Sequence, residues 1–438
     1  MNIILYSQQT SNRLSYIIDF FSRRISDDAI IITSDRTTYI NADAVKFNYS
    51  EQPIVANEIC IRPHGLLFQN NILVQNTSCV QWHNLTTFFQ TGGDLPFDVF
   101  AASFYLISRY EEYLPHEKDM YGRYAHENSL AYKERFLQLP LINIWLTELV
   151  KIVKQKFATF NSDHASFNFL PTYDVDIAYA YKYKPVTTQL AGAAKELLSL
   201  RWGELSARMK VAAGKTNDPF DTYDWLDSFH KKYALQPFYF FLLAARRKGY
   251  DKSIAPYSAG MQKLVKTISK TYDTGIHPSW QSGDDSGELK KEIAALQSIM
   301  MKPVTKSRQH YIRMNLPETY RLLLENGIKE DHSMGYGSIN GFRASVASAF
   351  YWYDLGADKE TKLIIRPFCY MEANSFFEQR YSAEQAAEEL QKYHDVIKSV
   401  NGELITIFHN HFITQQKQWL PWRNMYASFI AKNFDCGC

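Results

Sequence analysis

Polar side chains that could do chemistry follow five apolar segments of this sequence, each at the point where a strand is expected to end. The groups are Asp174 with Asp176, His277, Arg308 with His310, Asp331 with His332, and His409 with His411. The carboxyl ends of parallel strands in an α/β barrel converge on one mouth, so these side chains would be gathered in one place. Carboxylates, imidazoles and a guanidinium in one mouth indicate acid–base or metal-dependent chemistry.

The first group contains two aspartates, Asp174 and Asp176, in the sequence Thr-Tyr-Asp-Val-Asp that begins at Thr172. In extended structure, residues two apart lie on one face, which brings both carboxylates together. Two carboxylates so close repel each other unless a cation or a proton lies between them. The pattern therefore predicts one metal-bound carboxylate and one general base; the alternative is a solvated pair in a turn.

The histidines and the arginine have specific roles in such a site. His277 can offer neutral imidazole to a metal such as Zn²⁺, although a His before Pro is also common as a hydrogen-bonded turn residue. His409 follows the apolar stretch 404–408 and is expected to be a general acid, or else to bond a carbonyl at the core edge. Arg308 would hold Asp174 ionised and oriented, or else pair with a surface carboxylate.

The elements that must position these residues begin after residue 165. Seven segments have the composition of strands, and helical segments lie between most of them. The strands are expected at 166–171, 237–243, 274–277, 303–308, 327–330, 363–368 and 403–408. One helix is expected to begin at Ser382, where Gln385 completes a capping box. Seven strands with helical crossovers favour a parallel sheet, most economically a distorted (β/α)7 barrel over 165–438 with a helical insertion at about 185–220.

Residues 1–160 are expected to form a separate, smaller α/β domain. Its elements are predicted as strands at 3–6 and 29–33 and helices at 12–24, 98–113 and 141–157. The polar segment 161–165 that follows marks the boundary with the barrel.

The length of 438 residues fits two or three domains, or one large barrel with an extra domain. Hydrophobic residues make up 46% and charged residues 21%, which excludes a largely disordered chain. A net charge of +2 gives no reason to expect nucleic acid as a partner, and no apolar run approaches the roughly 20 residues that span a membrane. Because the N-terminus lacks a secretory signal pattern and the five cysteines are odd in number and dispersed, we expect a cytoplasmic protein with reduced thiols.

Four motifs occur in the order of those of polysaccharide deacetylases (carbohydrate esterase family four), which the chain resembles. They are Thr-Tyr-Asp-Val-Asp at 172–176, Gly-Ile-His-Pro-Ser-Trp at 275–280, Ser-Arg-Gln-His-Tyr at 307–311 and Ile-Thr-Ile-Phe-His-Asn at 405–410. Further segments resemble a bacterial branch of this superfamily that carries an extra N-terminal domain of unknown function. These segments are 108–113, 218–222, and 331–336 with 341–343. The likeness covers nearly the whole chain.

The resemblance implies a seven-stranded barrel that binds one divalent metal ion, expected to be Zn²⁺. By motif position, Asp174 would be the catalytic base and Arg308 its partner. Asp176 and His277 would be metal ligands, and His409 would be the general acid.

Two residues depart from the family's pattern. Gln281 stands where the family has a second His ligand, and His310 stands where the third motif has Pro. His310 is expected at a strand end two residues past Arg308, so it is a candidate for the missing ligand. The alternatives for His310 are packing and substrate contact.

Substrate contacts are expected at Trp280, whose ring could stack on a sugar, and at Asp331, Tyr336 and Arg343 in the branch motifs. The first functional hypothesis is a metal-dependent hydrolase that removes acetyl groups from N-acetylated sugars or polysaccharide precursors. The second, motivated by Gln281, is a carbohydrate-binding or scaffold protein that kept the barrel and lost turnover. The third is a metal-dependent hydrolase of another bond, such as an ester. The sequence predicts neither the particular sugar nor the oligomeric state.

Overall fold

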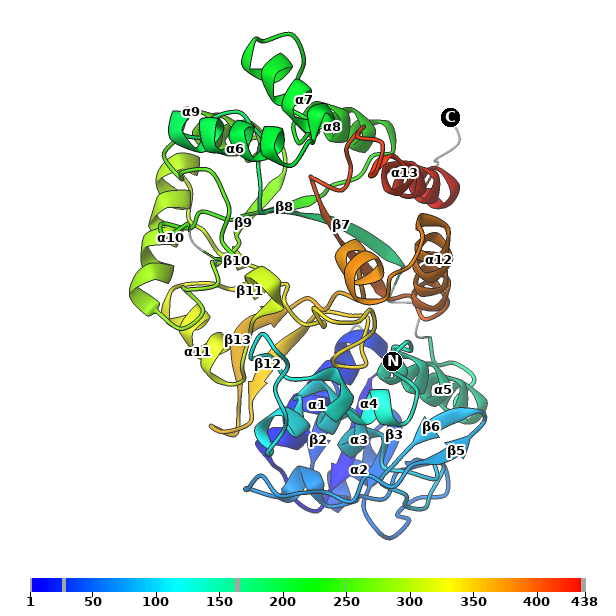
Figure 1. Ribbon diagram of the computed structural model, residues 1–438. Coiled ribbons are helices and arrows are strands. Elements are labelled where there is room, and N and C mark those ends of the chain that lie inside the picture. The colour runs from blue at the N-terminus through cyan, green and yellow to red at the C-terminus, as the bar shows by residue number, and fades with distance from the viewer. Residues whose placement is uncertain (1, 26–28, 162–165, 248, 435–438) are drawn as a thin grey trace.

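The computed structural model describes residues 2–25, 29–161, 166–247 and 249–434. Most of the boundary predicted at 161–165 therefore lies outside the described residues. We call residues 2–161 the N-terminal unit and residues 166–434 the C-terminal unit. Figure 1 shows the N-terminal unit, in blue and cyan, below the larger C-terminal unit.

The C-terminal unit is built on a nine-stranded sheet. Its strands are β7 (Asn168–Val175), β8 (Phe238–Phe241), β9 (Asp273–Ile276), β10 (Lys306–Ser307), β11 (Glu330–Asp331), β12 (Phe350–Asp354), β13 (Lys359–Ile365), β14 (Tyr370–Met371) and β15 (Glu403–His409). They lie in the order β12-β13-β11-β10-β9-β8-β7-β15-β14, and every neighbouring pair is parallel except β12 with β13. Seven of these strands overlap the seven predicted ones, which confirms the predicted parallel sheet.

A closed barrel is not confirmed. The sequence did not predict β12 and β14, and these two strands form the edges of the sheet. No backbone pairing joins the two edges within the described residues. Side chains of the N-terminal unit bond the backbone at the β12 edge instead: Tyr16 Oη donates to the Tyr351 oxygen at 2.8 Å, and Arg24 Nη2 to the Ala349 oxygen at 2.9 Å. An edge occupied in this way has fewer groups free to pair with another strand.

Helices surround the larger sheet (Figure 1). They are α6 (Val186–Leu198), α7 (Trp202–Ala212), α8 (Tyr223–Lys232), α9 (Ala259–Ile268), α10 (Ser286–Met300), α11 (Glu318–Glu325), α12 (Ala383–Ser399) and α13 (Leu420–Phe434). Ser382 caps α12 and Gln385 completes the capping box, as predicted. Each helix lies between two parallel strands or follows the last one, so the carboxyl ends of the strands face one edge of the sheet.

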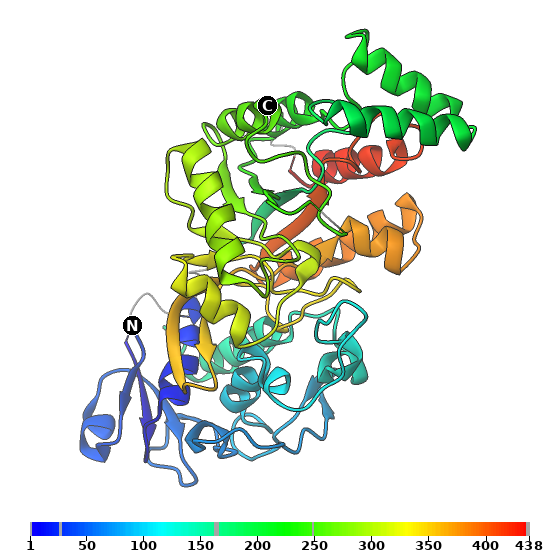
Figure 2. The same cartoon turned by 60° about the vertical axis from the view of Figure 1, so that its left-hand side comes forward.

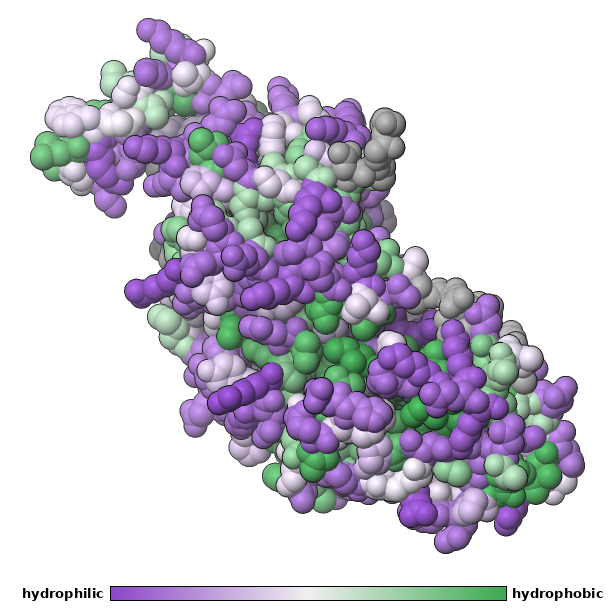
Figure 3. All heavy atoms as spheres, turned by 90° about the vertical axis from the view of Figure 1, so that its right-hand side faces the viewer, coloured by the Kyte–Doolittle hydropathy of each residue, from purple (hydrophilic) through white to green (hydrophobic). Residues whose placement is uncertain are grey.

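The predicted helical insertion is the hairpin of α6 and α7. It projects from the body of the molecule (Figures 2 and 3) and exposes large apolar side chains, among them Leu198 and Leu200. None of the helices in the described residues is long and apolar enough to span a membrane.

The N-terminal unit contains a four-stranded parallel sheet in the order β2-β1-β3-β4 and a separate two-stranded hairpin. Its strands are β1 (Ile3–Ser7), β2 (Ile31–Thr33), β3 (Val45–Tyr49), β4 (Ile59–Cys60), β5 (Val80–Trp82) and β6 (Leu85–Thr87). Its helices are α1 (Asn12–Ile25), α2 (Arg36–Asn41), α3 (Val99–Ile107), α4 (Leu130–Lys133) and α5 (Leu141–Lys156). The two predicted strands and the first and last predicted helices are confirmed.

The helix predicted at 98–113 is shorter than expected. It ends with α3 at Ile107, and a separate 3₁₀ turn, η2, follows at Tyr110–Tyr113. The break lies at Arg109, whose backbone is left-handed with φ 54°. An arginine seldom adopts this conformation, and here it lets the buried guanidinium turn back onto Glu111 and Glu112.

A buried cluster of one glutamate and two arginines joins the two units. Glu112 Oε1 accepts from Arg109 Nε at 2.7 Å and from Arg343 Nε at 2.8 Å. Arg343 Nη2 donates to Glu112 Oε2 at 2.6 Å, which makes the second contact a two-point one across the units. The side chains of Glu112 and Arg343 are at most 2% exposed. The segments 108–113 and 341–343, which carry the branch resemblance, therefore meet at this interface.

Candidate metal centre

The strand register brings the predicted residues to one edge of the sheet. His409 at the end of β15 lies opposite Asp174 of β7. Ser307 of β10 lies opposite Ile276 of β9, so Arg308 and His277 follow at neighbouring strand ends. Side chains far apart in the sequence therefore meet where the parallel strands end.

Asp176, His277 and His310 form a group of possible metal ligands at this edge. Their ligand atoms all lie within 4.8 Å of one another. Asp176 Oδ1 lies 3.2 Å from His277 Nε2, and Asp176 Oδ2 lies 3.4 Å from His310 Nε2. One carboxylate with two imidazoles is a ligand set that Zn²⁺ accepts in proteins.

Each imidazole is oriented through its other ring nitrogen. His277 Nδ1 donates to the Arg308 backbone oxygen at 2.5 Å, and His310 Nδ1 lies 3.0 Å from Asp251 Oδ1. With Nδ1 bonded to the Arg308 oxygen, Nε2 is the ring nitrogen of His277 that faces Asp176 and is available to a metal ion. Asp176 Oδ1 is itself buried without a hydrogen-bond donor in the described residues. A buried carboxylate oxygen 3.2 Å from an imidazole nitrogen can share one cation with it, so these residues fit a divalent metal ion.

The charges at the centre favour an ionised carboxylate. Burial raises the pKa of Asp176, but His310 and His409 lower it by more, so the pKa lies well below its ordinary value. Burial lowers the pKa of His310, while Asp176 and Asp251 raise it by more, to about 9. The negative charge on Asp176 is thus balanced by protons on its histidine neighbours or by a metal ion in their place.

Asp174 is held beside this group by Arg308. Arg308 Nη1 donates to Asp174 Oδ1 at 3.0 Å and to Thr172 Oγ1 at 2.5 Å, and Arg308 Nε donates to the His332 oxygen at 3.0 Å. The other carboxylate oxygen, Asp174 Oδ2, lies 3.8 Å from His277 Nε2. Asp174 is therefore fixed by a buried guanidinium on one side and faces the metal ligands on the other.

His409 is held by a carboxylate that the sequence analysis missed. Glu372, directly after β14, accepts from the His409 backbone N–H at 2.6 Å and lies 2.7 Å from His409 Nδ1. His409 Nε2 lies 3.6 Å from Asp176 Oδ2. Burial lowers the pKa of His409, but Glu372 and Asp176 raise it by more, to about 10. A protonated imidazole at this place can donate a proton.

These groups share one cavity of about 470 Å³. Its lining includes five predicted site residues: Asp174, Asp176, His277, His310 and His409. The rest of the lining is mostly aromatic and apolar. Gln281 belongs neither to the ligand group nor to the cavity lining within the described residues.

The residues predicted to contact the substrate do not all lie at the cavity. Trp280 is half-buried, and its ring centre lies 4.3 Å from that of Tyr250, which lines the cavity. Asp331, Tyr336 and Arg343 are not among the lining residues of the described chain, so their substrate contacts stay predictions.

Each of these three residues has a structural partner. Asp331 is fully buried and accepts from Ser307 Oγ at 2.7 Å and from the Ser333 backbone N–H at 2.8 Å. Arg343 bonds Glu112 across the interface. Tyr336 lies at the same interface and is buried there. They fix loops that follow β11 and do not face the cavity.

Asp251 is the second carboxylate that the sequence analysis missed. It is fully buried in the loop between β8 and α9, and Oδ1 also accepts from the Trp280 backbone N–H at 3.0 Å. No predicted strand ends at Asp251 and no motif contains it, so the sequence carried no signal that marked it as a site residue. Glu372 did carry one, because it follows a short apolar stretch just as the other site residues do.

A family model matches the N-terminal unit, and a separate comparison matches the chain to solved structures. Residues 3–158 match the model of a family of unknown function (DUF7033). The curated proteins contain no match to the chain. Solved structures that the chain is similar to include a putative polysaccharide deacetylase from Mycobacterium smegmatis, with 15% identity, a TM-score of 0.39, and coverage of 63% of this chain and 86% of that one.

Two other solved structures show a similar degree of likeness. The Puue allantoinase has 10% identity and a TM-score of 0.37 over 61% of this chain and 83% of its own. The polysaccharide deacetylase Bc1974 from Bacillus cereus has 11% identity and a TM-score of 0.31 over 61% of this chain and 88% of its own. TM-scores in this range do not establish a function, so the functional proposal rests on the residues of the site.

Proposed function

We propose that the chain is a metal-dependent hydrolase that removes acetyl groups from N-acetylated sugars. The observation that supports this proposal most is that three functional groups meet at one cavity, which Asp174, Asp176, His277, His310 and His409 line. They are the ligand group of Asp176, His277 and His310, the Asp174–Arg308 pair and the His409–Glu372 pair. The motif order shared with polysaccharide deacetylases supports the same reaction.

Asp176, His277 and His310 would hold the metal ion. A divalent ion there supplies Lewis-acid polarisation of an amide carbonyl. His310 would take the place of the ligand that Gln281 cannot provide. Its orientation by Asp251 is the carboxylate–histidine arrangement that fixes metal-binding imidazoles.

The two remaining pairs divide the proton transfers. Asp174, held in place by Arg308, accepts a proton from the attacking water. His409, kept protonated by Glu372, donates a proton to the departing amine nitrogen as the C–N bond breaks. Water is thereby split between the acetyl group, released as acetate, and the free amino sugar.

Acetate release from zinc-loaded protein tests the proposal. The substrates are N-acetylglucosamine and its β-1,4-linked oligomers, with an O-acetylated sugar as the ester alternative. We expect acetate from the N-acetylated substrates, with loss of activity in Asp174→Asn. Asp227→Asn is the matched control, because Asp227 lies on α8 and pairs with Lys231.

Two outcomes would contradict the proposal. Zinc-loaded protein that binds the oligomers without releasing acetate would favour the carbohydrate-binding alternative. Release from the O-acetylated sugar alone would favour an esterase.

A further inference from the structure

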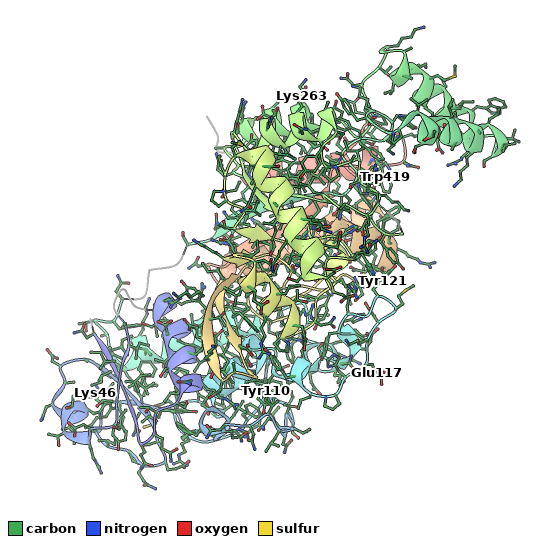
Figure 4. The ribbon with its side chains drawn as sticks, turned by 90° about the vertical axis from the view of Figure 1, so that its left-hand side faces the viewer. Lys46, Tyr110, Glu117, Tyr121, Lys263 and Trp419 are labelled. Atoms are coloured by element: carbon green, nitrogen blue, oxygen red, sulfur yellow. The ribbon has the colours of Figure 1, made fainter. Side chains whose placement is uncertain are left out.

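A loop of the N-terminal unit reaches the candidate active site. Tyr121 and Arg123 line the same cavity as the metal-centre residues, although they precede β7 by more than forty positions. Figure 4 shows Tyr121 on the side of the N-terminal unit that lies against the C-terminal unit. A tight turn presents it: Asp119 Oδ1 accepts from the backbone N–H groups of Tyr121 and Arg123, both at 2.9 Å.

This loop is fixed to the cavity wall. Arg123 Nη1 donates to the Tyr311 backbone oxygen at 2.6 Å, and Arg123 Nε pairs with Asp119 Oδ2 at 2.6 Å. The Arg123 guanidinium also lies 4.7 Å from the ring centre of Tyr121. A side chain at Gly337 would collide with that guanidinium, so the wall opposite the loop is shaped to receive it.

Tyr121 joins three rings of the C-terminal unit in what we call the aromatic cluster. Its other members are Tyr250, Trp280 and Tyr311. The ring centre of Tyr121 lies 5.5 Å from Tyr311, 5.8 Å from Tyr250 and 6.0 Å from Trp280. Tyr250 is 40% exposed, and the other three rings are only partly buried, so the cluster offers ring surface to solvent.

The cluster begins next to a candidate metal ligand. The ring centre of Tyr311 lies 4.6 Å from that of His310. Tyr311 and Ile312 both have left-handed backbones, with φ of 58° and 54°. Such conformations are costly for aromatic and β-branched residues and occur preferentially at ligand-binding sites. Here the unusual backbone places the ring beside the metal centre and its carbonyl on Arg123.

We infer that the aromatic cluster is a subsite for a second sugar ring, adjacent to the sugar that carries the acetyl group at the metal centre. Flat aromatic faces stack on the apolar faces of pyranose rings, and Tyr hydroxyls and the Trp N–H bond their rims. The ligand is therefore an N-acetylated oligosaccharide of two or more residues. This inference rests on the proposed function and assigns the N-terminal unit the role of completing the substrate pocket.

Equilibrium binding to zinc-loaded full-length protein tests the subsite. The probe is the β-1,4-linked tetramer of N-acetylglucosamine, measured by titration calorimetry beside the monomer. Tyr121→Ala should weaken tetramer binding about tenfold and leave monomer binding and metal content unchanged. Tyr121→Phe should keep most of the tetramer affinity, because the stacking ring remains and only the hydroxyl is lost. Tyr132→Ala is the matched control, since Tyr132 is an exposed tyrosine of the same unit outside the cavity lining.

The outcomes separate this inference from the proposed function. Weaker tetramer binding in Tyr121→Ala supports the subsite even if the wild type releases no acetate. Unchanged tetramer binding in Tyr121→Ala overturns the subsite even if acetate release is normal. Wild-type protein that does not bind the tetramer overturns it as well.

Discussion

Replacing Glu112 by Gln should destabilise the protein strongly, because Glu112 is the shared anion of two buried arginines. Burial raises the pKa of Glu112, but Arg343 and Arg109 lower it by more, to about 2. The ordinary pKa is 4.5. At about 1.4 kcal/mol per pKa unit, the difference between the unfolded and folded pKa corresponds to about 3 kcal/mol of folding free energy. Removing one partner of a buried ion pair typically costs roughly 3–5 kcal/mol, which agrees in magnitude.

The pH dependence of this effect has a definite sign. The folded pKa lies below the unfolded one, so the contribution of Glu112 is complete above about pH 4.5 and is lost as the pH falls towards 2. The difference in stability between wild type and Glu112→Gln should therefore be largest at neutral pH and shrink near pH 3.

Urea unfolding followed by tryptophan fluorescence measures both effects. Glu148→Gln is the matched control, because Glu148 pairs with Lys151 at the surface of α5, where the Lys151 side chain is 60% exposed. Surface pairs contribute about 0–1 kcal/mol, so this variant should unfold close to the wild type. A loss of less than about 1 kcal/mol in Glu112→Gln at neutral pH, or a deficit that grows as the pH falls, would show that the two arginines do not stabilise the Glu112 carboxylate in this way.

Three further predictions concern the site. Asp174→Asn should retain metal and lose about 10²–10⁴-fold in rate, measured as acetate release, because an amide cannot accept the proton. His310→Ala should weaken zinc binding strongly while Gln281→Ala leaves it unchanged, as judged by chelator competition; equal effects would remove His310 from the ligand set. Asp251→Asn should weaken zinc binding roughly tenfold in the same assay, because the substitution removes the negative charge of the carboxylate that orients His310. An Asp251→Asn variant with wild-type zinc affinity would show that Asp251 does not orient the ligand.

The strands and most of the site could be predicted because local pattern and sheet geometry agree. Apolar runs identified seven of the strands, and parallel strands carry their carboxyl ends to one edge whatever separates them in sequence. This geometry brings His310 close to Asp176, although no pattern in the sequence links the two residues directly. β14 was not predicted because it begins two residues after the stretch 363–368, for which the pattern predicts one strand only.

The residues that could not be predicted depend on how loops and units pack. Asp251 and Tyr121 lie on loops, and only tertiary structure brings them to the cavity. The segments with Tyr336 and Arg343 were recognisable as motifs, but a motif does not reveal what its side chains contact. Their partner turned out to be the N-terminal unit, through Glu112 and Arg109.

Metal content per chain tests whether Asp176, His277 and His310 form a metal centre. The protein is purified, incubated with Zn²⁺, dialysed and analysed by elemental mass spectrometry, together with an Asp176→Ala/His277→Ala double variant and the Asp227→Asn control. We predict close to one zinc ion per chain in the wild type and the control, and almost none in the double variant. Equal metal content in all three proteins, or no metal in the wild type, would contradict a metal centre at Asp176, His277 and His310.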